Sequence, residues 1–217
     1  MSVFRPFFFL AAIASLAIQT SCSSGPPKPN PNQVKIESAK FINPYPPGSY
    51  AHFSYRPYPA TMKTWKSQTL LNQSTPSNTR IKINLATQRG ILYVNDQVAM
   101  DYRISTGSSK YPTPTGSYRV IEKERKRVSN TYGKIKDADG KIVNSNADIR
   151  KDKVPEDGVF EGASMPYWMR LTWDGIGIHQ GKVSRRYASH GCIRTHYSAV
   201  PIVFSKTNIG TPVEITN

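Results

Sequence analysis

The sequence predicts a mainly β fold in which short strands are joined by turns, with one or two short helices and one long loop insertion. Between Arg80 and Ser105 apolar and polar residues alternate, which is the period of a strand with one buried face. Polar turns at "QRG" and "NDQ" interrupt this alternation at short intervals, as in an antiparallel meander. The chain is 38% hydrophobic, enough for a core, so disorder of the whole chain is excluded.

Each predicted element follows from its own pattern. In the first three predicted strands the residues expected to face inward are Ile81, Ile83 and Leu85, then residues 91–94, then Val98, Met100, Tyr102 and Ile104. In the later strands they are Tyr118 and Val120, then Met169, Leu171 and Trp173, then Val213 and Ile215. One helix is predicted at about residues 196–206, where Pro201 is compatible only with the first turns.

Residues 122–166 break the strand pattern. They are polar and rich in turn residues, and "DADGK" and "EDG" predict hairpin or loop turns. A loop of this length in a compact domain usually serves as a lid or a binding loop. An EF-hand calcium site is excluded, because the rest of the calcium loop is missing.

The N-terminus has the layout of a secretory signal. Arg5 precedes an apolar run from Phe7 to Ile18, which small and polar residues follow; this run is short for a membrane span. We predict that residues 1–21 are a signal peptide and that the protein is exported to a periplasm or cell envelope. The segment resembles a bacterial lipoprotein signal, in which Cys22 would carry the lipid that anchors the chain to a membrane. Cleavage to a soluble form is the alternative.

Two further segments precede the main domain. Residues 22–33 are rich in proline and lack an apolar period, so they predict an extended tether. Residues 34–78 are rich in proline and tyrosine. We expect this extension to pack against the main domain, residues 79–217, without regular secondary structure.

The net charge limits the classes of partner that the protein is expected to bind. The net charge of +15 favours an acidic partner such as nucleic acid, anionic lipid or a polymer that carries carboxylates. The densest basic patch, "EKERKRV", is interrupted by glutamates and does not resemble a nucleic-acid arm, so no nucleic-acid partner is predicted. No Walker, Rossmann or metalloprotease motif is present, and no cofactor or metal is expected.

The stretch "GIGIHQGKVSRRYASHGCIR" carries the chemistry. It contains two of the four histidines and one of the two cysteines. If Cys22 is lipidated or removed, Cys192 has no disulfide partner; a disulfide between the two is the alternative. A histidine can take the proton of a thiol, giving a thiolate–imidazolium pair that attacks an acyl carbon. Gly191 permits a tight turn that could aim backbone N–H groups at an oxyanion.

Spacing alone leaves other interpretations open. Cys192 could be an inert, buried apolar residue. His179, His190 and Cys192 could also bind zinc, although no fourth ligand stands at a usual spacing.

A family resemblance decides between these interpretations. "IHQGKVSRRYASHGCIR" resembles the signature of L,D-transpeptidases with a YkuD-type catalytic domain: a histidine, a variable spacer, Ser/Thr-His-Gly-Cys, an apolar residue, and Asn or Arg. "STGSSKYPTPTGSYRV" and "MPYWMRLTWDGIGIH" resemble further segments of that family. The similarity extends from about Arg80 to Thr216.

The resemblance implies a β-sandwich of mixed strands and peptidoglycan stem peptides as substrates. Cys192 would be the nucleophile and would release D-alanine from a tetrapeptide stem. His179 would be the general acid/base, with its ring oriented by the carbonyl of Gln180. Ser189, His190 and Gly191 would support the turn. Arg194 would either bind a substrate carboxylate or lock the loop.

Several points stay open at this level. The acceptor could be an amine, in cross-linking or in attaching a protein to the wall, or water, as in an L,D-carboxypeptidase or amidase. A non-catalytic module that binds the cell wall is the rival from another class. Tyr132, Tyr167 and Trp168 would each either line the cleft or pack in the core.

Overall fold

The structure is a computed structural model that describes residues 42–55, 58, 60–184 and 187–217. The predicted signal peptide, Cys22, the tether and the first residues of the extension lie outside the described residues. None of the helices in the described part has the length and apolar content that a membrane crossing requires.

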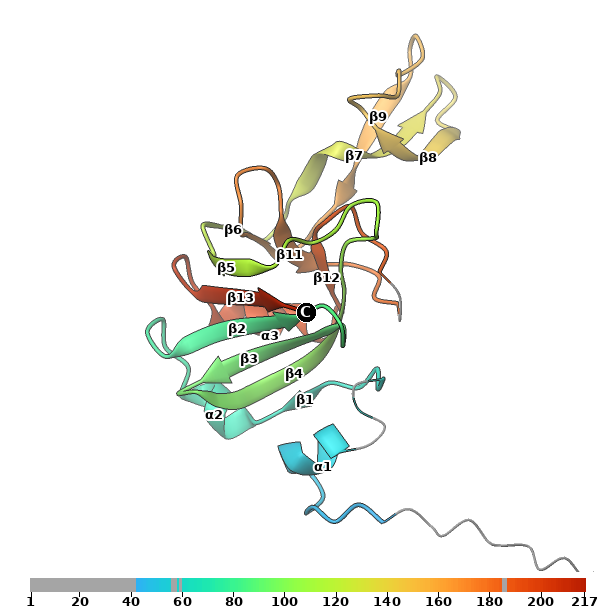
Figure 1. Cartoon of the computed structure of the whole chain (residues 1–217). Helices are drawn as coiled ribbons and strands as arrows, with labels where there is room; N and C mark the ends of the chain where they lie inside the picture. The colour runs from blue at the N-terminus through green and yellow to red at the C-terminus, as the bar shows by residue number, and fades with distance from the viewer. Residues whose placement is uncertain (1–41, 56–57, 59, 185–186) are drawn as a thin grey trace, which may run out of the picture. The chain divides into compact units, whose positions relative to one another are not determined.

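Strands dominate the described residues (Figure 1). In chain order the elements are α1 (Tyr50–Tyr55), β1 (Trp65–Lys66), α2 (Gln68–Asn72), β2 (Thr79–Asn84), β3 (Arg89–Val94), β4 (Gln97–Ser105), β5 (Gly116–Arg119), β6 (Glu122–Glu124), β7 (Val128–Lys136), β8 (Ile142–Asp148), β9 (Val159–Ser164), β10 (Trp168–Arg170), β11 (Gly177–Gln180), β12 (Ile193–Thr195), α3 (Val200–Lys206) and β13 (Pro212–Thr216).

The main sheet has ten strands in the order β5-β13-β2-β3-β4-β12-β11-β10-β6, with β1 added beside β4. It is mixed: β13 pairs with β2, and β11 with β12, in parallel. The core contains Ile81 and Leu92 from one half of the sheet together with Ile178 and Ile193 from the other. The sheet therefore curls around one core, and the predicted mainly β class with mixed strands is confirmed.

The predicted alternation is confirmed in β2 and β3, whereas β4 buries both of its faces from Ala99 to Ser105. Ile83, Met100 and Ile104 are fully buried, and the exposed fractions of Val213 and Ile215 are at most 2%. The turn between β3 and β4 is the two-residue hairpin loop Asn95-Asp96 with φ of 48° and 59°. Asn and Asp tolerate this left-handed conformation, which matches the twist of paired strands.

Two local predictions need correction. Trp173 is 76% exposed, because β10 ends at Arg170 and a turn follows in which Ile176 N–H donates to the Thr172 hydroxyl. The last helix begins at Val200 and not near His196. Pro201 lies at its start, as predicted, where a missing N–H costs nothing.

The segment predicted as a long loop insertion is largely strand. It contains β6 and a separate three-stranded sheet in the order β8-β7-β9, which we call the insertion sheet (Figure 1). Register shifts within β7, between Gly133 and Lys136, interrupt the period-two pattern that sequence analysis depends on. The predicted turn at "DADGK" does connect β7 to β8. Within it, the N–H of Gly140 donates to the carbonyl of Asp137 at 3.0 Å.

The extension also has regular structure, contrary to the prediction, although α1, β1 and α2 are only two to six residues long. It packs against the main domain as expected. Tyr50 Oη donates to Asp101 Oδ2 at 2.9 Å, and Arg89 donates to the carbonyl of Thr61 at 2.8 Å. Arg89 and Asp101 form an ion pair in which both side chains are 0% exposed. The extension therefore completes a buried charge network.

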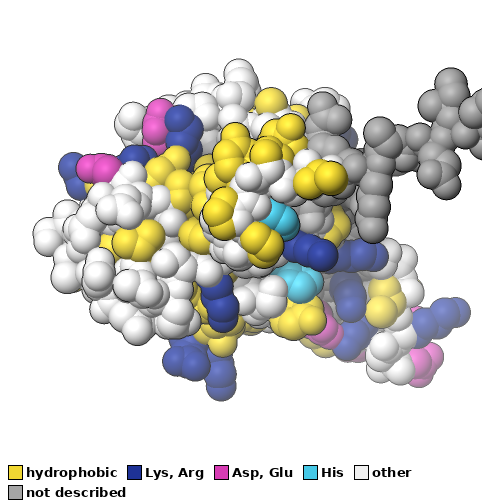
Figure 2. All heavy atoms as spheres, turned by 90° about the horizontal axis from the view of Figure 1, so that it is seen from below, with side chains coloured by type: hydrophobic (Ala, Val, Ile, Leu, Met, Phe, Trp, Pro, Cys, Tyr) yellow, Lys and Arg dark blue, Asp and Glu magenta, His cyan; other side chains and the backbone are white. Residues whose placement is uncertain are grey.

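The surface is basic, in keeping with the net charge of +15. On the face in Figure 2, Lys and Arg side chains lie beside hydrophobic and histidine side chains and exceed Asp and Glu. Such a surface attracts anionic polymers.

Candidate active site

The parallel pair β11–β12 brings the signature residues together. Ile178 pairs with Ile193, and both side chains are fully buried in the core. Because side chains alternate across a strand, the residues next to them face the opposite side. His179, Cys192 and Arg194 consequently share one face, and all three line one cavity of about 250 Å³.

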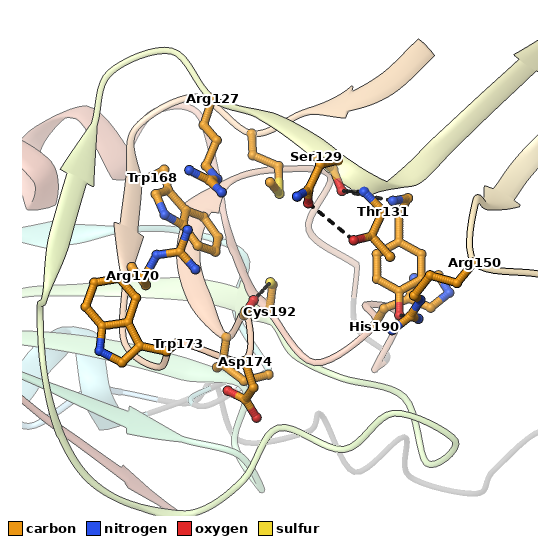
Figure 3. A pocket seen from close by; sticks show the side chains of 15 residues that line it. Arg127, Ser129, Thr131, Arg150, Trp168, Arg170, Trp173, Asp174, His190 and Cys192 are labelled. Carbon is orange, nitrogen blue, oxygen red and sulfur yellow. Dashed lines mark hydrogen bonds between the residues drawn. The ribbon is translucent and has the colours of Figure 1, made fainter. Parts of the chain in front are cut away.

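Cys192 lies where two cavities meet. It lines the 250 Å³ cavity and a larger one of about 490 Å³ (Figure 3). Its thiol is free and half-buried, and Sγ donates to the carbonyl of Gly175 at 3.4 Å. Burial raises the pKa of Cys192, and the N–H of Gly177 and the charge of Arg194 oppose this only in part.

The turn before the thiol is held by Ser189. Its hydroxyl donates to Cys192 O at 2.5 Å and accepts the N–H of Gly191 at 3.1 Å. Gly191 has φ of 110°, and a Cβ there would lie 2.7 Å from Ile176 Cδ1, so only glycine fits. The N–H of Gly191 is engaged by Ser189, so a backbone donor that the turn aims at an oxyanion would have to come from another residue.

His179 is held as a neutral base. Its ring is 7% exposed, and Nδ1 donates to the carbonyl of Gln180 at 2.7 Å. A carbonyl only accepts, so the proton is on Nδ1 and the Nε2 lone pair is free. Burial lowers the pKa of His179 to about 4; the Gln180 carbonyl opposes the shift and the positive Arg194 adds to it.

These shifts bear on the predicted thiolate–imidazolium pair. A lowered histidine pKa and a raised thiol pKa both favour the neutral forms, thiol and imidazole, in the resting site. Among the described residues no hydrogen bond joins the His179 ring to Cys192. The proton therefore has to move as substrate is attacked.

A pH series distinguishes the two resting states. We expect the alkylation rate of Cys192 by iodoacetamide to rise about tenfold per pH unit from pH 5 to 8, because a neutral thiol gives thiolate in that proportion. The rate is measured by mass spectrometry of the peptide that contains Cys192. A rate independent of pH over this range would show the ion pair instead.

The contacts of His190 are those of a packed aromatic ring and do not indicate a role in proton transfer. Its ring is stacked on Tyr132 at 4.3 Å between centroids and lies 4.6 Å from the ring of Tyr111. Burial lowers the pKa of His190. It lines both cavities beside Cys192.

Arginines surround the thiol (Figure 3). Arg127 and Arg170 line the larger cavity and are paired with Glu122. Arg194 differs: it is half-buried, and among the described residues no carboxylate or carbonyl pairs with it. A half-buried cation without a carboxylate partner is available to an anionic ligand.

Sequence analysis did not single out Arg127, Arg170 or Tyr111, although Tyr111 and Arg170 lie within segments that resemble the family. Of the three aromatic residues considered, Tyr132 and Trp168 line cavities, whereas Tyr167 packs edge-on against Phe204 at 5.6 Å. Within the described residues, no three His, Cys, Asp or Glu side chains are grouped so as to hold a metal ion.

Comparison with known proteins places this arrangement in a family. Residues 78–215 match the YkuD family, described as the L,D-transpeptidase catalytic domain. The chain is similar to L,D-transpeptidase 1 of Mycobacterium tuberculosis, with 28% identity over 129 residues, 56% of this chain and 43% of that protein. It therefore spans less than half the length of that relative.

Solved structures show the same likeness. An L,D-transpeptidase from Mycobacterium smegmatis superposes with a TM-score of 0.50 at 18% identity, covering 64% of this chain and 59% of that one, which supports the fold. The structure of Mycobacterium tuberculosis L,D-transpeptidase 1 matches with a TM-score of 0.47 at 22% identity over 64% and 62% of the two chains. The family match includes β11, β12 and the turn that presents Cys192, and this chain belongs to the YkuD family of L,D-transpeptidase catalytic domains.

Proposed function

We propose that the protein is a peptidoglycan L,D-transpeptidase that works by cysteine acyl transfer. One observation carries the proposal: a free thiol and a neutral histidine face the same 250 Å³ cavity in a domain of this family. The histidine is on β11, and the thiol directly precedes the neighbouring strand β12. This is the pairing of nucleophile and base that acyl transfer requires.

The first half-reaction forms a thioester. As Cys192 Sγ attacks the carbonyl before the terminal D-alanine of a tetrapeptide stem, its proton passes to Nε2 of His179. The C–N bond then breaks, and the same proton goes to the amine of the departing D-alanine. The Gln180 carbonyl, 2.7 Å from Nδ1, stabilises the imidazolium that exists between these events.

The second half-reaction resolves the thioester. An amine of a second stem attacks, His179 takes its proton, and the restored thiol leaves. The product is a cross-link, or a wall-attached protein if the amine belongs to a protein. The rival outcome is hydrolysis by water, which gives a tripeptide stem.

Arg194 is proposed to bind a carboxylate of the stem. Its guanidinium lines the cavity with His179 and Cys192, and charge-assisted hydrogen bonds to a carboxylate contribute about 1.5–3 kcal/mol. We expect Arg194→Ala to raise KM about tenfold or more with a smaller change in kcat, measured by steady-state kinetics with a tetrapeptide. Arg80→Ala, whose side chain pairs with an 86% exposed Asp96, is the control. A fall in kcat alone would assign Arg194 to the chemical step.

Location is part of the same proposal. Export through the signal peptide, a lipid on Cys22 and the proline-rich tether would place the domain in the cell envelope, where peptidoglycan lies. The basic surface supports an anionic polymer as partner.

Intact mass spectrometry tests the proposal. After incubation with a tetrapeptide muropeptide, we expect a covalent acyl adduct on Cys192, with release of D-alanine, and none on Cys192→Ala. Wall binding that persists in both proteins without any adduct would support the non-catalytic module. An adduct followed by tripeptide alone, with an amine acceptor present, would support the hydrolase.

A further inference from the structure

The ring of His190 is held from two sides by tyrosines of different segments. Tyr132, on β7 of the insertion sheet, stacks on it at 4.3 Å with an interplanar angle of 21°. Tyr111, on the segment between β4 and β5, lies 4.6 Å away at 46°. Aromatic pairs of this kind attract each other beyond the effect of the area that they bury. The signature turn is thus in direct contact with the insertion sheet.

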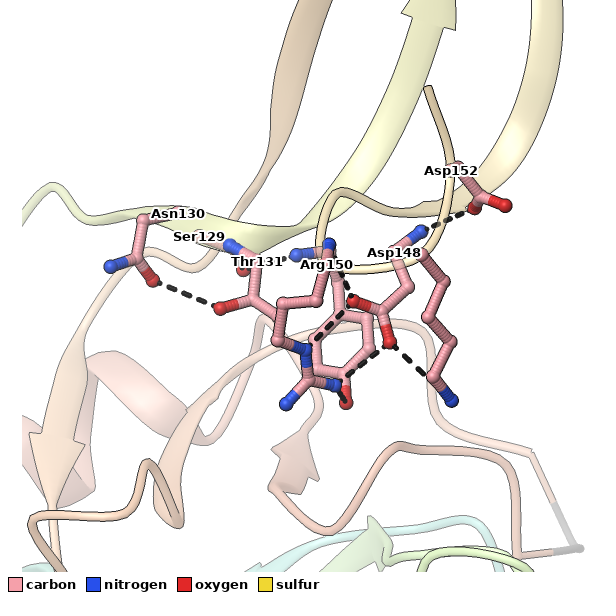
Figure 4. A network of polar contacts seen from close by, with 8 residues as sticks. Ser129, Asn130, Thr131, Asp148, Arg150 and Asp152 are labelled. Atoms are coloured by element: carbon pink, nitrogen blue, oxygen red, sulfur yellow. Dashed lines mark hydrogen bonds and ion pairs between the residues drawn. The ribbon is translucent and has the colours of Figure 1, made fainter. Parts of the chain in front are cut away.

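Arg150 fixes the tyrosine on the insertion side (Figure 4). Its guanidinium donates to Tyr132 Oη at 2.8 Å and binds both carboxylate oxygens of Asp148 at 2.8 Å. Asp148 is the cross-strand partner of Tyr132 between β8 and β7, and its own N–H donates to Asp152 at 2.8 Å. The phenol is therefore held at its ring and at its hydroxyl.

The Tyr132–His190 stack stands where the two cavities adjoin. Both rings line the 490 Å³ cavity and the 250 Å³ cavity. His179 lines only the smaller cavity, whereas Arg127 and Arg170 line only the larger one. The residues common to both cavities are Ser129, Tyr132, Met165, His190 and Cys192. The stack separates the two spaces beside the thiol and joins the insertion sheet to the turn.

We infer that Tyr132 is a specificity-determining residue that keeps the insertion sheet closed over Cys192 through His190, so that an amine and not water resolves the thioester. This inference rests on the proposed function. In transfer, the C–S bond breaks as a C–N bond forms, and the proton of the amine passes through His179 to the thiolate sulfur. In hydrolysis, a C–O bond forms instead and the stem leaves as a free acid. Loss of the phenol ring would join the two spaces beside the thiol and admit water between them.

The test compares Tyr132→Ala with Tyr132→Phe in the full chain. Both are incubated with a tetrapeptide and an excess of an amine acceptor, and the ratio of hydrolysed to transferred product is measured by chromatography. We expect Tyr132→Ala to raise this ratio about tenfold, because the variant loses both the stack on His190 and the hydrogen bond from Arg150. Tyr132→Phe keeps the ring and brings the ratio back toward wild type. Val143→Ala, on β8 with a side chain 52% exposed, is the control within the same sheet.

A second measurement does not depend on turnover. Labelling of Cys192 by a fluorescein maleimide, quantified on its tryptic peptide, reports access to the thiol. We expect faster labelling in Tyr132→Ala, and in Arg150→Ala to a smaller degree, with thermal melting as the check that each variant is folded. An unchanged product ratio in a folded Tyr132→Ala overturns the inference, even if labelling is faster. If the wild type forms no acyl adduct, the proposed function fails; labelling then decides alone whether the stack closes the cavity, and an unchanged rate rejects it.

Discussion

Replacing His179 by glutamine is expected to slow acyl-enzyme formation by about 10²–10⁴-fold, the usual contribution of a positioned general base. The amide fills much of the space of the ring but cannot accept the thiol proton at Nε2. Because burial holds the pKa of His179 at about 4, the base form is present throughout pH 5–8. The wild-type acylation rate is therefore expected to stay flat over that range and to fall only as the pH approaches 4.

Single-turnover acylation by a tetrapeptide, followed by mass spectrometry, measures this effect. His196→Ala is the matched control, because that ring contacts the Ser198 hydroxyl at 2.8 Å and lines neither cavity at Cys192. An acylation rate in His179→Gln within a few-fold of wild type would remove His179 from the reaction. An acid limb near pH 6.5 would instead show a solvated imidazole.

The second large effect concerns the ion pair beneath the extension. Asp101→Ala leaves Arg89 as an uncompensated charge at 0% exposure and removes the acceptor of Tyr50. Breaking a buried pair from one side typically costs about 3–5 kcal/mol. We expect a loss of this size in the free energy of unfolding, measured by urea denaturation.

Asp96→Ala is the comparison for this loss. It breaks the Arg80–Asp96 pair, in which Asp96 is 86% exposed, and exposed pairs contribute about 0–1 kcal/mol. Equal losses in the two variants would show that the extension does not shield Arg89 from water. A chain lacking residues 43–63 is expected to resemble Asp101→Ala, because Arg89 loses the carbonyls of Thr61 and Lys63.

Sequence analysis predicted the part of the fold that period two governs. Strands β2, β3 and β13 largely bury alternate residues, so their faces can be recognised from a short stretch of chain. The insertion sheet could not be recognised, because the shifts around Gly133 interrupt its period and Val128 and Val159 are 60% exposed. Burial, which gives a strand its signal, is confined there to a few positions such as Ile135 and Ala147.

The candidate site could likewise be predicted from the sequence only in part. Cys192 and His179 are visible in the sequence because a turn and a strand end fix them locally. Their protonation states are not visible, since these depend on burial by residues far along the chain. The contacts of Tyr111 and Tyr132 with His190 join residues at least 58 positions apart, counting from 132 to 190, and no spacing rule covers such a contact.

The parallel register of β11 and β12 has a consequence for engineering. His179 lies on the middle rung of this ladder, and Cys192 directly precedes the rung formed by Ile178 and Ile193. The register therefore decides whether the base and the nucleophile share a face. Deleting a single residue from β11 would turn the imidazole toward the hydrocarbon interior.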